Sequence, residues 1–81
     1  MTKRRALEIL HRVWGCGEIL LAREVAEIDP VALHMETPLA TVARIAGIKV
    51  DHIAAFDNES IYWLTSRAMA FLDIAEHSPR R

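Results

Sequence analysis

Apolar residues recur along the chain at the three- and four-residue spacing of amphipathic helices. Over residues 2–14 they keep this spacing and stop at Gly15-Cys16-Gly17. The pattern returns over residues 19–28 and ends at Asp29-Pro30. No segment alternates apolar and polar residues with the period of two that a β-hairpin requires, so we expect no wing. The pattern predicts an all-α chain.

Two residue pairs mark the starts of further helices. Proline is tolerated in the first helical turn, because the amide that it lacks would have no partner there. Asp29-Pro30 therefore predicts a short helix that reaches about His34. Thr37-Pro38 repeats the same device and predicts a helix that opens at Leu39.

Gly47 interrupts the helical pattern once more. After it we expect a short helix over residues 48–56, and then a terminal helix over residues 59–77 that Asn58 caps. The fold prediction is one domain, residues 1–81, built as a compact bundle of five to six short helices.

The stretch from Leu39 to Asn58 has the pattern of a helix-turn-helix. Two closely crossing helices need a small residue at their contact, a glycine in the turn, and a branched apolar residue that locks the second helix. Ala43, Gly47 and Ile53 meet these needs, at spacings of four and six residues. Further apolar residues stand at the other inward positions: Val42, Ala46, Ile48 and Phe56. The sequence predicts a helix-turn-helix over 39–58.

Residues 42–48, together with Ile53, Phe56, Ile61 and the apolar run 68–74, resemble the helix-turn-helix and following helix of phage CII-type transcriptional activators. More loosely they resemble the wider phage-repressor class. The likeness covers about half of the chain, and its motif is generic. It implies a phage or bacterial DNA-binding regulator whose recognition helix reads the major groove and whose last helix holds an oligomer together. It places these residues toward the groove: Lys49, Asp51, Ala54, Ala55 and Asn58, with Arg44 near the DNA backbone.

Charge complicates this assignment, because residues 1–12 carry a net +3 and residues 13–79 carry four basic and ten acidic residues. A flexible basic arm of Lys3, Arg4 and Arg5 can contact phosphates, or it can simply solubilise the terminus. Ala54 and Ala55 can touch thymine methyls, or they can form an apolar patch for a protein partner. Both alternatives stay open.

The terminal helix carries two apolar stripes where a surface helix of a small domain needs one. We expect the first to face the core: Ile61, Leu64, Ala68, Leu72 and Ala75. The second is expected to form a dimer interface: Trp63, Ala70, Phe71 and Ile74. The alternative is that other helices of the same chain cover both faces.

The remaining residues favour no catalytic or metal chemistry. Cys16 is the single cysteine, which leaves no intramolecular disulfide and suggests a reducing, cytoplasmic setting. The four histidines are scattered, without the spacing of a metal site. No apolar run reaches the ~20 residues of a membrane span. We expect no enzyme, no cofactor and no membrane insertion.

The sequence thus predicts a small DNA-binding transcription regulator that acts on double-stranded DNA as a homodimer or higher homo-oligomer. The alternative is a non-enzymatic protein-interaction module on a helix-turn-helix scaffold, such as an anti-repressor, an antitoxin or an adaptor.

Overall fold

Helices form every regular element that the computed structural model describes, and it describes residues 1–51 and 57–77. In chain order the elements are α1 (Lys3–Leu10), the π-helical turn η1 (His11–Gly15), α2 (Ala22–Ala26), the 3-10 turn η2 (Ala32–His34), α3 (Pro38–Ala46) and α5 (Asn58–His77). The all-α prediction is confirmed for these residues, which contain no strand. They hold four α-helices and two single helical turns, so the count of five to six helices stays a prediction.

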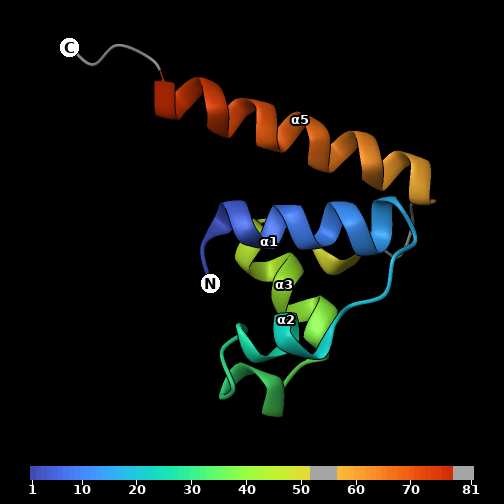
Figure 1. Cartoon of the computed structure of the whole chain (residues 1–81), viewed down its shortest axis with the longest axis vertical. Helices are drawn as coiled ribbons and strands as arrows, with labels where there is room; N and C mark the ends of the chain where they lie inside the picture. The colour runs from blue at the N-terminus through green and yellow to red at the C-terminus, as the bar shows by residue number, and fades with distance from the viewer. Residues whose placement is uncertain (52–56, 78–81) are drawn as a thin grey trace.

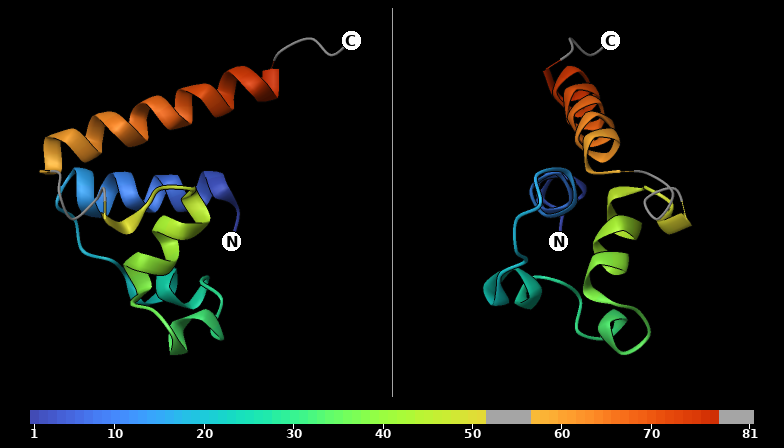
Figure 2. Two further views of the ribbon diagram at one scale, coloured as in Figure 1. Left: turned by 180° about the vertical axis from the view of Figure 1, so that it is seen from behind. Right: turned by 90° about the vertical axis from the view of Figure 1, so that its right-hand side faces the viewer.

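Helix α1 lies at the centre of the fold. Its residues Ala6, Leu7, Ile9 and Leu10 are fully buried. Figures 1 and 2 show the reason: α5 runs antiparallel along one side of α1, while α3 crosses it on the other side. Helix α2 and η2 lie beyond α3, at the far end from α5. The core is therefore the interface of three helices rather than a layered sheet.

The first helix does not continue regularly to Trp14 as the spacing predicts. After Leu10 it widens into the π-helical turn η1, which packs against the start of α5. A Cβ atom on Gly15 would lie only 3.0 Å from the Cα of Tyr62, so glycine permits this close approach. His11 Nδ1 lies 2.9 Å from the hydroxyl of the buried Thr65, which donates to the Ile61 carbonyl.

Helix α2 is much shorter than the predicted helix over residues 19–28. Gly17 turns the chain with φ +74°, and Leu21 keeps extended backbone angles, so the helix begins only at Ala22. Ile19 is 81% exposed and therefore adds no buried area that would reward an earlier start. Over residues 19–21, amphipathic spacing does not suffice for a helix, because only one of the apolar residues, the half-buried Leu20, packs on the core.

The segment after Asp29-Pro30 is also less helical than predicted. The Asp29 carboxylate accepts a hydrogen bond from the Val31 amide at 2.9 Å, which forms a local turn. Only the 3-10 turn η2 follows, and it does include His34.

Helix α3 begins as the Thr37-Pro38 pair predicts. The Thr37 hydroxyl accepts from the Ala40 amide at 3.2 Å, and Pro38, one residue before Leu39, opens the helix. Its buried residues face α1: Thr41, Val42, Ala43 and Ala46.

Helix α5 starts one residue earlier than predicted, because Asp57 caps it in place of Asn58. The Asp57 carboxylate accepts from the Ser60 amide at 2.8 Å, and this hydrogen bond lowers the pKa of Asp57. Ile61 and Thr65 of α5 are buried, while further core contacts come from Ala68, Met69 and Leu72, which are half-buried. Leu64, which the sequence also places on the core stripe, is half-buried. Ala75, which the sequence places on the core stripe, is exposed.

Within the described ranges, no helix combines the length and the apolar character that crossing a membrane requires.

Candidate functional surfaces

The turn after α3 has the geometry that the helix-turn-helix pattern requires of its first half. Gly47 ends α3 in the left-handed conformation at φ +80°, and the Ile48 amide donates to the Ala43 carbonyl at 3.0 Å. Val42 and Ala43 are fully buried against α1. The chain is helical again at residues 50–51. The second half of the motif, with Ile53, Ala54, Ala55 and Phe56, lies outside the described residues, so the complete motif stays a prediction.

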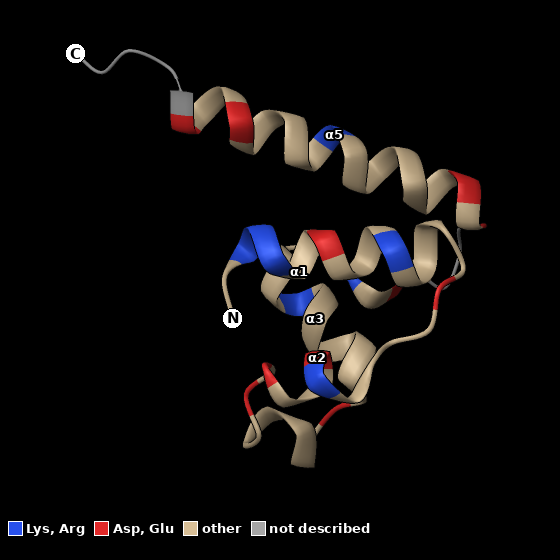
Figure 3. Cartoon of the chain, in the orientation of Figure 1, with Lys and Arg blue, Asp and Glu red and all other residues tan. Residues whose placement is uncertain are grey.

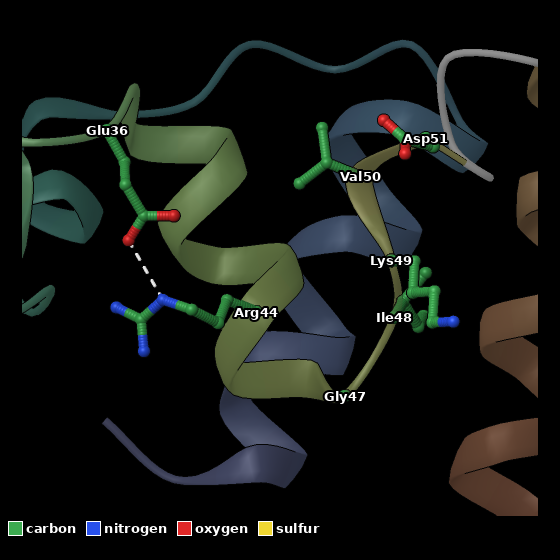
Figure 4. A pocket seen from close by; sticks show the side chains of 7 residues that line it. All are labelled: Glu36, Arg44, Gly47, Ile48, Lys49, Val50 and Asp51. Atoms are coloured by element: carbon green, nitrogen blue, oxygen red, sulfur yellow. Dashed lines mark hydrogen bonds and ion pairs between the residues drawn. The ribbon is translucent and has the colours of Figure 1, made fainter.

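A hollow of about 390 Å³ lies beside this turn and brings together three of the predicted DNA-contacting residues, Arg44, Lys49 and Asp51 (Figure 4). The Arg44 Nε donates to the Glu36 carboxylate at 2.9 Å, although the Arg44 side chain is still 56% exposed. The Lys49 side chain points away from Arg44. The hollow therefore mixes two cations with two carboxylates instead of presenting a uniformly basic surface.

Lys3 reaches the same turn from α1. Its Nζ lies 3.5 Å from the position that a Cβ on Gly47 would take, and Lys3 is exposed. Among the residues that the structure describes, neither Lys3 nor Lys49 has a carboxylate within ion-pair distance. These two ammonium groups are the cations at the turn that are available to an anionic partner.

The expected flexible arm at residues 3–5 is not present, because these residues form the first turn of α1. Arg4 reaches the end of α5: its Nη2 lies 2.7 Å from the Asp73 carboxylate and 2.9 Å from that of Glu76. That nitrogen makes no hydrogen bond of good geometry, so the attraction is mainly electrostatic, while Nε donates to Glu76 at 3.3 Å. Both carboxylates raise the pKa of Arg4. Figure 3 shows the basic start of α1 beside the acidic end of α5.

Arg5 forms ion pairs on the opposite side of α1. Its guanidinium holds the Glu27 carboxylate through two hydrogen bonds of 3.0 and 3.1 Å, which lowers the pKa of Glu27 and raises that of Arg5. Arg4 and Arg5 therefore tie α1 to α5 and to the end of α2. Sequence spacing cannot reveal this, because every carboxylate involved is at least 19 residues away along the chain.

Asn58 also lies away from the turn. Its side-chain nitrogen is 3.8 Å from the position that a Cβ on Gly17 would take, at the junction of α5 with the loop before α2. The structure thus separates Asn58, Arg4 and Arg5 from the hollow that Arg44, Lys49 and Asp51 share.

A buried carboxylate that the sequence reading missed holds α2 against α1. Glu24 is 2% exposed, and it forms ion pairs with Arg12 and, at 3.4 Å, with Arg5. Its second oxygen accepts from the Leu21 amide at 3.0 Å, which caps the first turn of α2. The sequence contains one signal for this cap, a glutamate three residues after the capping residue Leu21. Both oxygens of the Glu24 carboxylate are thus engaged within the fold, one by the two arginines and the other by the Leu21 amide.

The second apolar stripe of α5 faces away from the core, as its pattern predicts. Trp63, Phe71 and Ile74 are 59%, 66% and 63% exposed, and Ala70 is exposed as well. The alternative, that helices of the same chain cover both faces of α5, is wrong for these four residues. We define the α5 outer face as Ser60, Trp63, Leu64, Arg67, Ala70, Phe71 and Ile74.

The described residues contain no cluster of three or more histidine, cysteine, aspartate or glutamate side chains that could hold a metal ion. Comparison with protein-family models, with curated proteins and with solved structures finds no match to this chain. Its function is therefore argued from its own residues.

Proposed function

We propose that this chain is a DNA-binding regulator of the helix-turn-helix type that docks on double-stranded DNA through the turn after α3. The observation that carries the proposal is the left-handed Gly47 between the buried end of α3 and the helical residues 50–51. A short turn of this kind sets the first helix across the backbone and the second in the major groove. Lys49 is exposed and directly precedes the helical residues 50–51.

Charge supports a narrower set of contacts than the sequence pattern suggests. Lys3 and Lys49 supply phosphate contacts from either side of Gly47. Arg44 joins them by exchanging Glu36 for a phosphate, which costs little because exposed ion pairs contribute only about 0–1 kcal/mol. Arg4 and Arg5 are left out, since binding DNA would break the pairs that hold α1 to its neighbours.

The test is duplex binding measured at several salt concentrations between about 50 and 200 mM, the range in which phosphate contacts lose affinity steeply. We expect Lys49→Ala and Lys3→Ala each to weaken binding and to reduce the slope of log affinity against log salt by about 1. Arg23→Ala is the matched control, because Arg23 is an exposed cation on α2, away from the turn. Its affinity should equal that of the unchanged chain.

The proposal fails if no duplex, specific or random, binds at the lowest salt concentration. It also fails if Arg23→Ala weakens binding as much as Lys49→Ala, because binding would then be a diffuse charge effect that does not involve the turn.

The second candidate, a protein-interaction module on the same scaffold, is favoured by the mixed charge of the hollow. Glu36 and Asp51 lie there beside Arg44 and Lys49. The two carboxylates repel phosphate, whereas a mixture of both charges is complementary to a polar protein surface. A protein-interaction module uses Asp51 for its protein partner and has no measurable duplex affinity. In a DNA-binding regulator, Asp51→Ala strengthens duplex binding by removing a charge that repels phosphate. A gain in duplex affinity for Asp51→Ala therefore favours the first candidate, and the absence of duplex binding in both chains favours the second.

A further inference from the structure

The outer face of α5 forms one continuous apolar surface along the helix. Two adjoining hollows of about 500 and 180 Å³ share Arg67 and Phe71, and Trp63 and Ile74 stand at their opposite ends. The opposite side of the helix, with the buried Ile61 and Thr65, meets α1 and η1. The helix is therefore apolar on two sides, and the described helices pack on only one of them.

The spacing on this face is that of a helix-pairing seam. Ser60, Trp63, Arg67, Ala70 and Ile74 follow one another at steps of three, four, three and four residues, the heptad spacing of coiled coils. Leu64 and Phe71, seven residues apart, flank the seam on one side. Such a seam fits a second helix lying along α5 better than it fits a compact ligand.

We propose that the occupant is a second copy of α5, which pairs with the first in antiparallel orientation about a twofold axis between residues 68 and 69. This orientation sets Trp63 of each copy opposite Ile74 of the other, and Arg67 opposite Ala70. The bulky and small positions are then complementary, as a twofold contact requires, because each residue pair occurs twice. The stem of Arg67 lies over the small Ala70, and its charged head extends toward water.

A parallel pair fits the same residues less well. It would set Arg67 directly against its own copy, so that two long side chains would compete for the same space. It would also set Ala70 against Ala70 and leave a gap beside two large aromatic residues. Shape therefore selects the antiparallel orientation.

The exposed area suffices for a weak but specific dimer. An exposed aromatic residue contributes on the order of 100–150 Å² here, so the outer face supplies roughly 500–600 Å² per copy. The pair then buries on the order of 1,000–1,200 Å², the lower limit for a specific interface. We expect a dissociation constant in the micromolar range. The pairing gives the dimer its geometry and does not depend on whether the chain binds DNA.

Cysteine cross-linking tests the orientation. In a Cys16→Ser background, Ala70→Cys and Ser60→Cys are both close in size to the residues that they replace. At 1.5 Å per residue, the two copies of position 70 are offset by roughly 5 Å along the helices, and those of position 60 by roughly 26 Å. A bis-maleimide about as long as one helix diameter, roughly 10 Å, should link Ala70→Cys chains and leave Ser60→Cys chains unlinked. Equal linking of both variants, or linking of Ser60→Cys alone, overturns the proposal.

Sedimentation equilibrium tests the surface itself. We expect the unchanged chain to show a concentration-dependent monomer–dimer equilibrium and Phe71→Arg to weaken dimerisation at least tenfold. Met35→Arg is the matched control, because Met35 is 86% exposed and lies outside α5. Ile74→Arg serves if Phe71→Arg loses its helical circular dichroism. A chain that stays monomeric at several hundred micromolar, about a hundredfold above a micromolar constant, or a control that dissociates equally, refutes the pairing.

Discussion

Replacing Glu24 by glutamine tests whether the buried ion cluster holds α2 to the rest of the fold. The substitution keeps the size of the side chain and one oxygen for the Leu21 amide, but it removes the charge that Arg12 and Arg5 share. Arg12 loses the one ion pair that the structure gives it, while Arg5 retains Glu27. The loss therefore falls mainly on the contact between Glu24 and Arg12.

The magnitude follows from burial. A hydrogen bond to a charged group contributes about 1.5–3 kcal/mol, and the nearly complete burial of Glu24 places this pair in that range. The Arg12 side chain is 30% exposed and regains some hydration, so we expect a loss of about 2 kcal/mol. A chain of this length has roughly 4–12 kcal/mol of stability. The melting temperature should then fall by roughly 8–16 °C.

Urea unfolding followed by circular dichroism measures this loss. Glu27→Gln is the matched control, because Glu27 binds the same Arg5 but its side chain is 42% exposed, and its effect should be clearly smaller. Equal effects of the two substitutions, or a loss below about 0.5 kcal/mol for Glu24→Gln, the range typical of surface changes, would refute the view that burial makes this cluster important.

Three further predictions concern the helix junctions and the charges. Gly15→Ala forces a Cβ to within 3.0 Å of the Tyr62 backbone and should cost about 1–3 kcal/mol in urea unfolding; a neutral effect would mean that η1 and α5 are not in tight contact. Gly47→Ala forces alanine into a left-handed conformation and should cost about 1–2 kcal/mol in the same assay, and an unchanged midpoint would speak against that backbone geometry. Stability should also decline in acid: the folded pKa values of Glu27 and Asp57 lie below their ordinary values of 4.5 and 3.8, so their contribution is present above those values and is lost as pH falls through the lower folded ones. Unfolding measured from pH 6 to pH 2 checks this, and the Glu27→Gln chain should lose less stability over that interval.

Local signals in the sequence were enough to place the start of α3 and the turn that follows it. Thr37-Pro38 defines the start of α3 through a hydroxyl cap, and Gly47 defines its end through a backbone angle that favours glycine. The outward stripe of α5 was visible for the same reason, since residues three and four apart share a helix face. These features depend only on neighbours in sequence.

Features that depend on distant neighbours were not predictable. The start of the chain reads as a basic arm, yet the carboxylates of α5 and α2 neutralise Arg4 and Arg5 once the helices pack. Residues 19–21 carry helical spacing, but Ile19 is exposed, and the segment is not helical. Helix propensity does not decide whether a segment is helical where packing supplies or withholds the free energy of burial.

The central place of α1 also has a consequence for synthesis. This helix leaves the ribosome before the elements that cover its two sides, because α3 and α5 follow it by about 35 and 55 residues. At roughly 5–20 residues per second, α1 waits a few seconds or longer with its apolar side chains uncovered. The contact of Arg4 with Glu76, which spans 72 positions, forms only after the end of α5 has been made. The nascent chain is therefore most exposed to aggregation and to chaperones during the interval before α5 emerges.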